Sequence, residues 1–217
     1  MTVVAIDGPA GAGKSTVARR VASALGYRHL DTGAMYRAVA LAALERGLGP
    51  EQAASLEQLA ADLDLAIEGD RVLVEGRDVS ARVRQPDVTR AVSAYSAVPG
   101  VRAALVHRQR ELAAQRDVVM EGRDIGTAVV PDAGIKIFLT ASIRERALRR
   151  LADQGADDAP TRSELEASIA ARDEADATRA ASPFVRAPDA VVVDSTGKDV
   201  DDVVAELLLL IGERERR

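Results

Sequence analysis

Residues 8–15 read G-P-A-G-A-G-K-S, which is the G-x-x-x-x-G-K-S pattern of a phosphate-binding loop. The apolar run Val3–Ile6 before the motif predicts a buried strand. Apolar residues at helical spacing after it predict a helix that begins near Ser15. In such a turn, backbone N–H groups and the positive end of the helix dipole face one anion. The motif therefore predicts an α/β fold with a phosphate site at the end of the first strand.

The residue types within the motif predict separate roles in holding a nucleotide. We expect Lys14, on a surface loop, to place its charge near the β- and γ-phosphates, and Ser15 to offer its hydroxyl to Mg2+. The alternative is a glycine-rich turn that carries one exposed lysine. The predicted nucleotide-binding residues are Gly8, Pro9, Ala10, Gly11, Ala12, Gly13, Lys14, Ser15 and Thr16.

Composition excludes several other classes of protein. The 217 residues suffice for one sizeable domain, and the net charge of −5 argues against a surface that coats nucleic acid. Cysteine is absent, so disulfides and thiolate metal sites are excluded. The longest aliphatic run, Leu207–Ile211, is too short to cross a bilayer, and no signal segment precedes the first strand. We therefore expect a soluble, cytoplasmic protein that does not bind membranes or nucleic acid.

Alternating strand and helix patterns predict the arrangement of the chain. Apolar runs at 3–6, 118–120, 135–139 and 190–193 and a short stretch at 28–30 read as strands, and helical patterns follow most of them. This order is typical of a three-layer fold with a central, five-stranded parallel sheet and helices on both faces. The residues Gly8, Asp31, Glu121 and Asp194 follow directly on strand ends. We expect all four to face one crevice at the carboxyl edge of the sheet.

The stretch 63–85 has a different pattern. Apolar residues alternate with polar ones at 63–67 and 72–74, with turns predicted at 69–70 and 76–78 and a third strand at 79–83. Closely spaced strands with short turns indicate a small antiparallel sheet. We interpret about 58–98 as a subdomain inserted into a single domain that spans 1–217, with proline-initiated helices at 86–98 and 99–116.

Three further groups of residues could carry chemistry. Glu121 and Asp124 follow the strand at 118–120, where a carboxylate can help to hold Mg2+. Arg146, Arg149 and Arg150 share one helix face, so they should repel one another until a polyphosphate binds; a solvated face balanced by acidic neighbours is the alternative. The breaker-rich loop that follows favours a lid at about 150–163 that is mobile without substrate.

The third group shares another helix face. Spacing alone predicts that Arg172, Asp176 and Arg179 form a row of ion pairs on the surface. His29 and His107 read as structural.

Four stretches together resemble bacterial cytidylate kinases. They are I-D-G-P-A-G-A-G-K-S-T (6–16), D-T-G-A-M-Y-R (31–37), E-G-R-D-I-G-T (121–127) and R-D-E-A-D-A-T-R-A (172–180). Their order and spacing match along essentially the whole chain, and the enlarged insertion that binds the nucleoside monophosphate in that family matches the inserted sheet. One departure is Glu121, where many relatives carry aspartate.

The resemblance implies roles that spacing could not supply. It places the acceptor phosphate against Thr32, Arg37 and Arg123, and the cytosine edge against Ser93, Arg102 and Asp124. It also assigns Arg172, Asp176 and Arg179 to the sugar and phosphates, which replaces the ion-pair interpretation. The implied catalytic residues are Lys14, Arg37, Arg123, Arg149 and Arg150, and the implied metal ligands are Ser15 and Glu121.

The implied reaction transfers the γ-phosphoryl group of ATP to CMP or dCMP, with Mg2+ as cofactor and a monomer as the expected state. Another small P-loop kinase is the nearest alternative, but such kinases need neither the inserted sheet nor the G-R-D arginine. A GTP-dependent switch would need an N-K-x-D motif, which the sequence lacks. The resemblance therefore favours a nucleoside monophosphate kinase of pyrimidine nucleotide metabolism.

Overall fold

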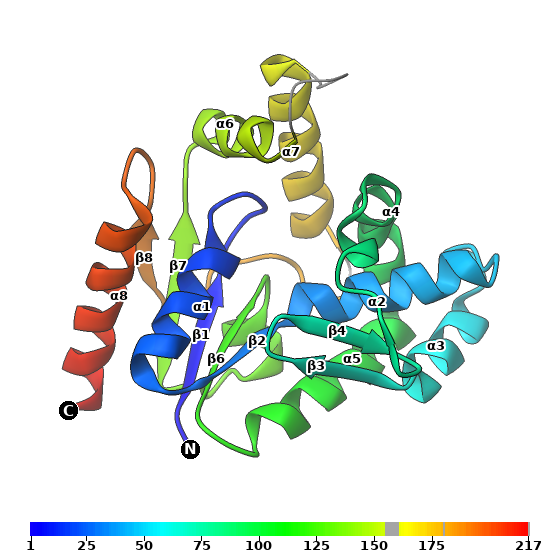
Figure 1. Ribbon diagram of the computed structural model, residues 1–217, viewed down its shortest axis with the longest axis horizontal. Coiled ribbons are helices and arrows are strands. Elements are labelled where there is room, and N and C mark those ends of the chain that lie inside the picture. The colour runs from blue at the N-terminus through cyan, green and yellow to red at the C-terminus, as the bar shows by residue number, and fades with distance from the viewer. Residues whose placement is uncertain (155–160, 180, 217) are drawn as a thin grey trace.

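A parallel five-stranded sheet forms the centre of the computed structural model, which describes residues 1–154, 161–179 and 181–216 (Figure 1). Its strands are β1 (Val3–Asp7), β2 (Arg28–Asp31), β6 (Val118–Gly122), β7 (Ile135–Thr140) and β8 (Val191–Asp194). They lie in the order β2-β6-β1-β7-β8, and every neighbouring pair is parallel. The predicted sheet is confirmed, and its central strand β1 leads directly into the phosphate loop.

Helices cover both faces of this sheet (Figure 1). On one face, α1 (Lys14–Leu25) and α8 (Val200–Glu215) share a core with sheet residues such as Val4 and Ile6. The larger core on the other face joins the sheet to α2 (Thr32–Glu45), α3 (Ala53–Asp62), α4 (Pro86–Ser96) and α5 (Pro99–Ala113). Both faces of a parallel sheet must be covered because its strands are apolar on both sides.

Helix α2 is buried on almost every side, which fixes the direction of Arg37, its partly exposed side chain near the site. Between Ala34 and Ala43 every residue except Arg37 is buried. A helix that is apolar all round belongs inside a core, and α2 contributes to the core that joins the sheet to the inserted segment. The Asp31 side chain caps its N-terminus by accepting a hydrogen bond from the Ala34 amide at 2.9 Å. Arg37 is thereby held one turn from the end of β2.

The inserted antiparallel sheet is present, but its third strand was predicted in the wrong place. Its strands are β3 (Leu65–Glu68), β4 (Arg71–Val74) and β5 (Arg77–Asp78), in that order. The second turn is the pair Glu75 and Gly76, both with positive φ (51° and 73°), so the chain reverses one residue earlier than expected. The predicted strand 79–83 instead leads into a 3₁₀ helix, η1 (Arg82–Arg84).

Helices α6 (Ile143–Gln154) and α7 (Arg162–Ala177) stand together beyond the end of the sheet, above the loop that joins β1 to α1 (Figure 1). They form a small core of their own from Ala147, Leu165 and Ile169. A capping box between Thr161 and Glu164 fixes the start of α7. Residues 155–160, in the middle of the segment predicted as a lid, lie outside the described residues.

Candidate active site

The phosphate loop packs tightly against the neighbouring strand β7. A Cβ atom on Gly8 would lie 2.0 Å from the carbonyl oxygen of Leu139, so only glycine allows this approach. Gly13 has a φ of 86° and caps α1, whose first residue is Lys14. The Lys14 ammonium donates to the Pro9 carbonyl across the loop at 2.9 Å. Lys14 is expected on a surface loop, but the residue is buried, with 8% of its surface accessible, which also rules out the alternative of an exposed lysine.

Glu121, at the end of β6, links the phosphate loop to β2 and α2. Its Oε2 accepts a hydrogen bond from the Ser15 hydroxyl at 2.8 Å, and its Oε1 lies 3.0 Å from Nε2 of His29. Its backbone carbonyl accepts from the Thr32 hydroxyl at 2.6 Å. The predicted neighbours Ser15, Glu121 and Thr32 are therefore brought together. His29 is a partner of Glu121, so it belongs to the site and does not only fill the core.

The expected acceptor side begins at Asp31, which holds Arg37 in place. Arg37 donates to Asp31 Oδ2 at 2.9 Å, and Arg84 from the inserted segment lies 3.8 Å from the same oxygen. Burial acts to raise the pKa of Asp31, but Arg37, the Ala34 amide and Arg84 together hold that pKa below its usual value. Asp31 is thus an ionised carboxylate that orients two arginines.

Arg123 connects the phosphate loop to α7. Its Nη1 donates to the Gly8 carbonyl and its Nε to Asp176 Oδ2, each at 3.0 Å. Its guanidinium also lies over the ring of Phe184, 5.7 Å from the centroid. Arg179 lies 3.7 Å from the other oxygen of Asp176. Burial, followed by the charge of Arg123, lowers the pKa of Arg172 to about 10. The interpretation of Arg172, Asp176 and Arg179 as a row of ion pairs on the surface is wrong for Asp176, which is buried and accepts from Arg123.

A buried ion pair lies on the side of the site expected to read the base. Arg102 of α5 donates to Asp124 Oδ2, and both side chains are almost fully buried. The Arg102 guanidinium lies over the Tyr36 ring, 5.2 Å from its centroid, and its Nη1 reaches the Ser96 carbonyl at 3.5 Å. Ser93 lies close by on α4, where its carbonyl accepts from the Ser96 hydroxyl. The structure therefore brings Ser93, Arg102 and Asp124 into one region.

The arginines of α6 do not form a self-repelling face. Arg146 is buried and donates to Asp173 at 2.6 Å and to the Ala10 carbonyl at 3.2 Å. Arg149 donates to Glu145 at 3.0 Å and to the Ser195 carbonyl at 2.7 Å. The repulsion argument for Arg146, Arg149 and Arg150 is therefore wrong for the first two, which tie α6 to the phosphate loop and to the β8–α8 connection. Arg150 lies close enough to Arg172 to help lower its pKa.

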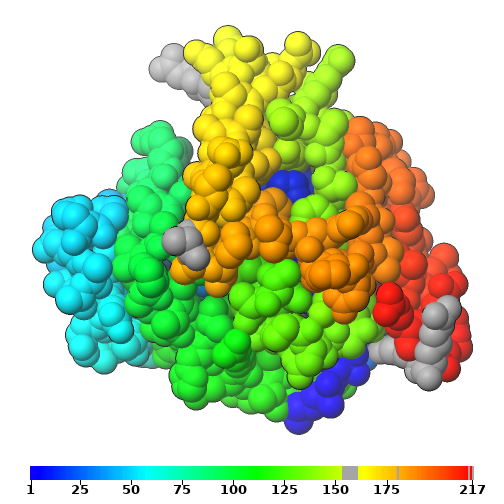
Figure 2. All heavy atoms as spheres, turned by 180° about the vertical axis from the view of Figure 1, so that it is seen from behind, coloured from blue at the N-terminus to red at the C-terminus, as the bar shows by residue number. Residues whose placement is uncertain are grey.

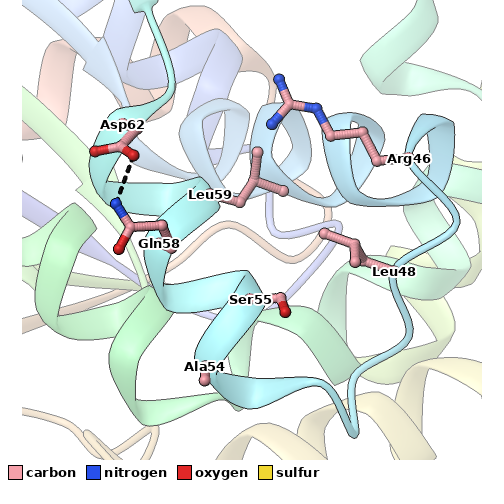
Figure 3. A pocket seen from close by; sticks show the side chains of 7 residues that line it. All are labelled: Arg46, Leu48, Ala54, Ser55, Gln58, Leu59 and Asp62. Atoms are coloured by element: carbon pink, nitrogen blue, oxygen red, sulfur yellow. Dashed lines mark hydrogen bonds between the residues drawn. The ribbon is translucent and has the colours of Figure 1, made fainter.

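The strand-end residues converge less completely than expected. Gly8, Asp31 and Glu121 meet, whereas Asp194 is exposed and accepts hydrogen bonds from Thr196 instead. Seen from behind, dark blue atoms of the N-terminal region are visible at the bottom of a hollow beside α7 (Figure 2). A separate open depression of about 460 Å³ lies at the opposite end of α2, and none of its lining residues belongs to this site (Figure 3).

A family model described as cytidylate kinase matches residues 4–213. The chain belongs to the cytidylate kinase family. A cytidylate kinase from Symbiobacterium thermophilum is 49% identical over 212 residues, which cover 95% of this chain and 94% of that protein. One from Mycobacterium leprae is 48% identical over 217 residues, covering 98% and 96%. Membership thus rests on nearly the whole length of both chains.

Two other comparisons extend this result. A bifunctional pantoate ligase/cytidylate kinase from a Synechococcus species is 49% identical over 98% of this chain, but the chain spans only 45% of that relative. A shikimate kinase from Bacteroides thetaiotaomicron superimposes with a TM-score of 0.52 at 15% identity, covering 97% of this chain and 98% of that one. This second likeness supports the P-loop kinase fold alone.

One buried residue of this cytidylate kinase family member has no counterpart among the predicted site residues. The Asp7 carboxylate, at the end of β1, accepts hydrogen bonds from the amides of Ile125 and Gly126, both at 2.8 Å. It thereby fixes the chain just after Asp124 against the start of the phosphate loop. Burial raises the pKa of Asp7 to about 6, although the two amides act to lower it. The only sequence signal was a charged residue at the end of an apolar strand.

Asp7 should make the stability of the protein depend on pH. Its folded-state pKa of about 6 lies above the ordinary value of 3.8, so the folded protein holds this proton more tightly than the unfolded chain. The contribution of Asp7 to the free energy of unfolding should therefore fall as pH rises from about 4 to about 6, by at most about 3 kcal/mol, and stay lower above that range. The Asp7→Asn variant has no carboxyl group at this position, so it lacks this contribution to the pH dependence of stability. The difference in unfolding free energy, wild type minus variant, should be larger at about pH 4.5 than at about pH 7.5 in denaturant titrations. Equal differences at both pH values would rule out this assignment.

Proposed function

We propose that this site transfers the γ-phosphoryl group of ATP to CMP or dCMP, giving CDP or dCDP and ADP. The observation that carries the proposal is the position of Arg123. Its guanidinium donates to the Gly8 carbonyl of the donor loop at 3.0 Å and also contacts Asp176 of α7. A phosphate clamp attached to the donor loop holds donor and acceptor next to each other, which is the main requirement for phosphoryl transfer.

The acceptor phosphate is held by Arg37 and Arg123, with Thr32 beside them. Asp31 orients Arg37 at 2.9 Å, and Asp176 orients Arg123 at 3.0 Å, so each guanidinium is fixed before substrate arrives. Arg172 and Asp176 of α7, with Arg179 just after this helix, contact the sugar and phosphates. Because the acceptor is already an ionised phosphate, the reaction needs no strong general base. The chain's contribution is alignment and neutralisation of charge.

The donor is held by the phosphate loop and by the arginines of α6. Backbone N–H groups of the loop and the Lys14 ammonium bind the β- and γ-phosphates. Arg149 already contacts the loop through the Ala12 carbonyl at 3.3 Å, so a small rotation brings it to the phosphates. Arg150, the next residue of α6, is the second arginine that we assign to the donor phosphates. Helices α6 and α7 exclude water over the loop, because an open site would hydrolyse ATP.

The residues near the donor loop fit a magnesium ion that arrives with ATP. Among the described residues, no three acidic, histidine or cysteine side chains converge to hold a metal alone. The Ser15 hydroxyl and the Glu121 carboxylate are nonetheless adjacent oxygen ligands, 2.8 Å apart. Mg2+ characteristically takes one or two protein oxygens and completes its shell with phosphates and water. When bound, it neutralises charge on the β- and γ-phosphates. Ser15 and Glu121 are the residues that would hold it.

Asp124 recognises the cytosine base. Arg102 holds its carboxylate in place, and the Ser93 hydroxyl lies nearby. A carboxylate accepts from the N4 amino group of cytosine, whereas uracil presents an oxygen at that position. The buried pair leaves Asp124 little freedom to adapt to the wrong base.

We further propose that the protein is a monomer. Among the described residues, no helix is long and apolar enough to cross a membrane.

One assay tests the proposal directly. ADP release from ATP is coupled to an optical signal and measured with CMP, dCMP, UMP, AMP and GMP in turn, each with and without Mg2+. Steady ADP release that requires a monophosphate and is fastest with CMP or dCMP is the expected result. Release without any acceptor, or a clear preference for a purine monophosphate, would contradict the proposal.

A further inference from the structure

Arg84 connects the inserted segment to the expected acceptor site. It is the last residue of η1, and its Nη2 lies 3.8 Å from Asp31 Oδ2, at the end of β2. Its side chain is 52% accessible, whereas that of Asp31 is only 13% accessible. A half-exposed guanidinium therefore reaches from the inserted segment toward a mostly buried carboxylate.

Asp31 does not need Arg84 as a partner. Its Oδ2 already accepts from Arg37 and its Oδ1 from the Ala34 amide, both at 2.9 Å. At 3.8 Å, Arg84 is beyond hydrogen-bond distance, so attraction of charge alone holds it there. In the part of the chain that the structure describes, this long ion pair is the contact that orients the Arg84 head group. Its N–H donors are consequently available to another anion.

The charges around Asp31 favour such an anion. Arg37 and Arg84 share one carboxylate oxygen, which leaves one positive charge uncompensated between them. Arg172 adds to it, since Arg37 and Arg172 are close enough to affect the pKa of Arg172. A phosphate dianion carries the charge and the oxygens that match several guanidinium groups at once. Both guanidinium groups reach the same oxygen of Asp31, so one phosphate beside that oxygen can contact both.

We infer that Arg84 is a further substrate-binding residue, whose guanidinium leaves Asp31 and binds the phosphate of the acceptor nucleotide. This inference rests on the proposed function, because it takes the ligand beside Arg37 to be a nucleoside monophosphate. It gives the inserted segment a direct contact with the substrate. Since the contact is to the phosphate, Arg84 should affect CMP and UMP equally and should not affect a nucleoside that lacks the phosphate.

The test compares Arg84→Gln with Arg82→Gln. Arg82 lies on the same 3₁₀ helix, is similarly exposed and pairs with Asp87, so it serves as a matched control. We expect Arg84→Gln to raise the KM for CMP about tenfold or more, which is the effect of losing one charge-assisted hydrogen bond. The kcat and the KM for ATP should stay within about twofold of wild type. Arg82→Gln should leave all three constants unchanged, and Arg84→Lys should recover part of the loss.

Binding of cytidine separates a phosphate contact from an indirect effect. The inhibition constant of cytidine, measured against CMP, should be the same in wild type and Arg84→Gln. An unchanged KM for CMP would overturn the inference, and so would an equal loss of affinity for CMP and cytidine, because that loss would come from distortion of the inserted segment. If wild type itself shows no CMP-dependent ADP release, the proposed function fails, and that result is distinct from either outcome for Arg84.

Discussion

Replacing Lys14 with methionine should lower the kcat for phosphoryl transfer by about 10²- to 10³-fold, the usual cost of removing one preorganised charge from a transition state. The ammonium lies inside the phosphate loop, 2.9 Å from the Pro9 carbonyl, and no neighbouring lysine can replace it. The fold should survive. Burial, followed by the nearby charge of Arg123, lowers the pKa of Lys14 to about 7, so the charged form is costly to bury. Methionine keeps the length of the side chain and removes that charge.

The measurement is single-turnover transfer from ATP to CMP, together with thermal unfolding of both proteins. Lys198→Met is the matched control, because Lys198 is a half-exposed lysine paired with Glu206 on the β8–α8 side. It should keep wild-type activity. An unfolded Lys14→Met variant, or one that retains most of its kcat, would contradict the role of this residue.

The parts of the fold that could be predicted are those that local chemistry determines. The phosphate loop was identified because an anion held by backbone amides needs glycine at fixed positions and a helix directly after them. The five parallel strands were found because strands covered on both faces are short, continuous apolar runs. These signals lie within a few residues of one another, so a single sequence contains them in full.

The errors occurred where contacts between distant residues decide the structure. Arg146 was expected to repel its neighbours, but Asp173, 27 residues away, pairs with it. Asp7 was overlooked because its partners, the Ile125 and Gly126 amides, lie more than a hundred residues away in the sequence. His29 meets Glu121 across two neighbouring strands. No local pattern reports such pairings, which only the strand order brings about.

The misplaced strand at 79–83 has a local cause. Apolar residues at alternate positions suggested a strand there, and Arg77 and Asp78 were assigned to the preceding turn. In the structure Arg77 pairs with Val74 and Asp78 with Leu73, so both belong to the sheet. Glu75 takes a positive φ of 51°, which is uncommon for a residue other than glycine, asparagine or aspartate. The tighter turn therefore could not be predicted from residue type.

Replacing Asp124 with asparagine should lower kcat/KM for CMP and narrow the difference between CMP and UMP by about tenfold or more. The carboxylate accepts from the N4 amino group of cytosine, but against uracil it faces another acceptor, so its oxygen toward the base stays buried without a donor. An asparagine amide can donate to O4 of uracil instead. Values of kcat/KM for CMP, dCMP and UMP in both proteins measure this effect.

Stability must be separated from base recognition in this experiment, because Asp124 forms a buried pair with Arg102. Removing one partner of such a pair leaves the other charge uncompensated, which costs about 3–5 kcal/mol. The CMP:UMP ratio avoids this difficulty, since a smaller folded fraction lowers both rates equally. Asp31→Asn is the matched control: it weakens the pair with Arg37 on the phosphate side, so it should reduce both rates and leave the ratio unchanged. If Asp124→Asn also leaves the ratio unchanged, Asp124 acts on the phosphates or the metal, and other residues read the base.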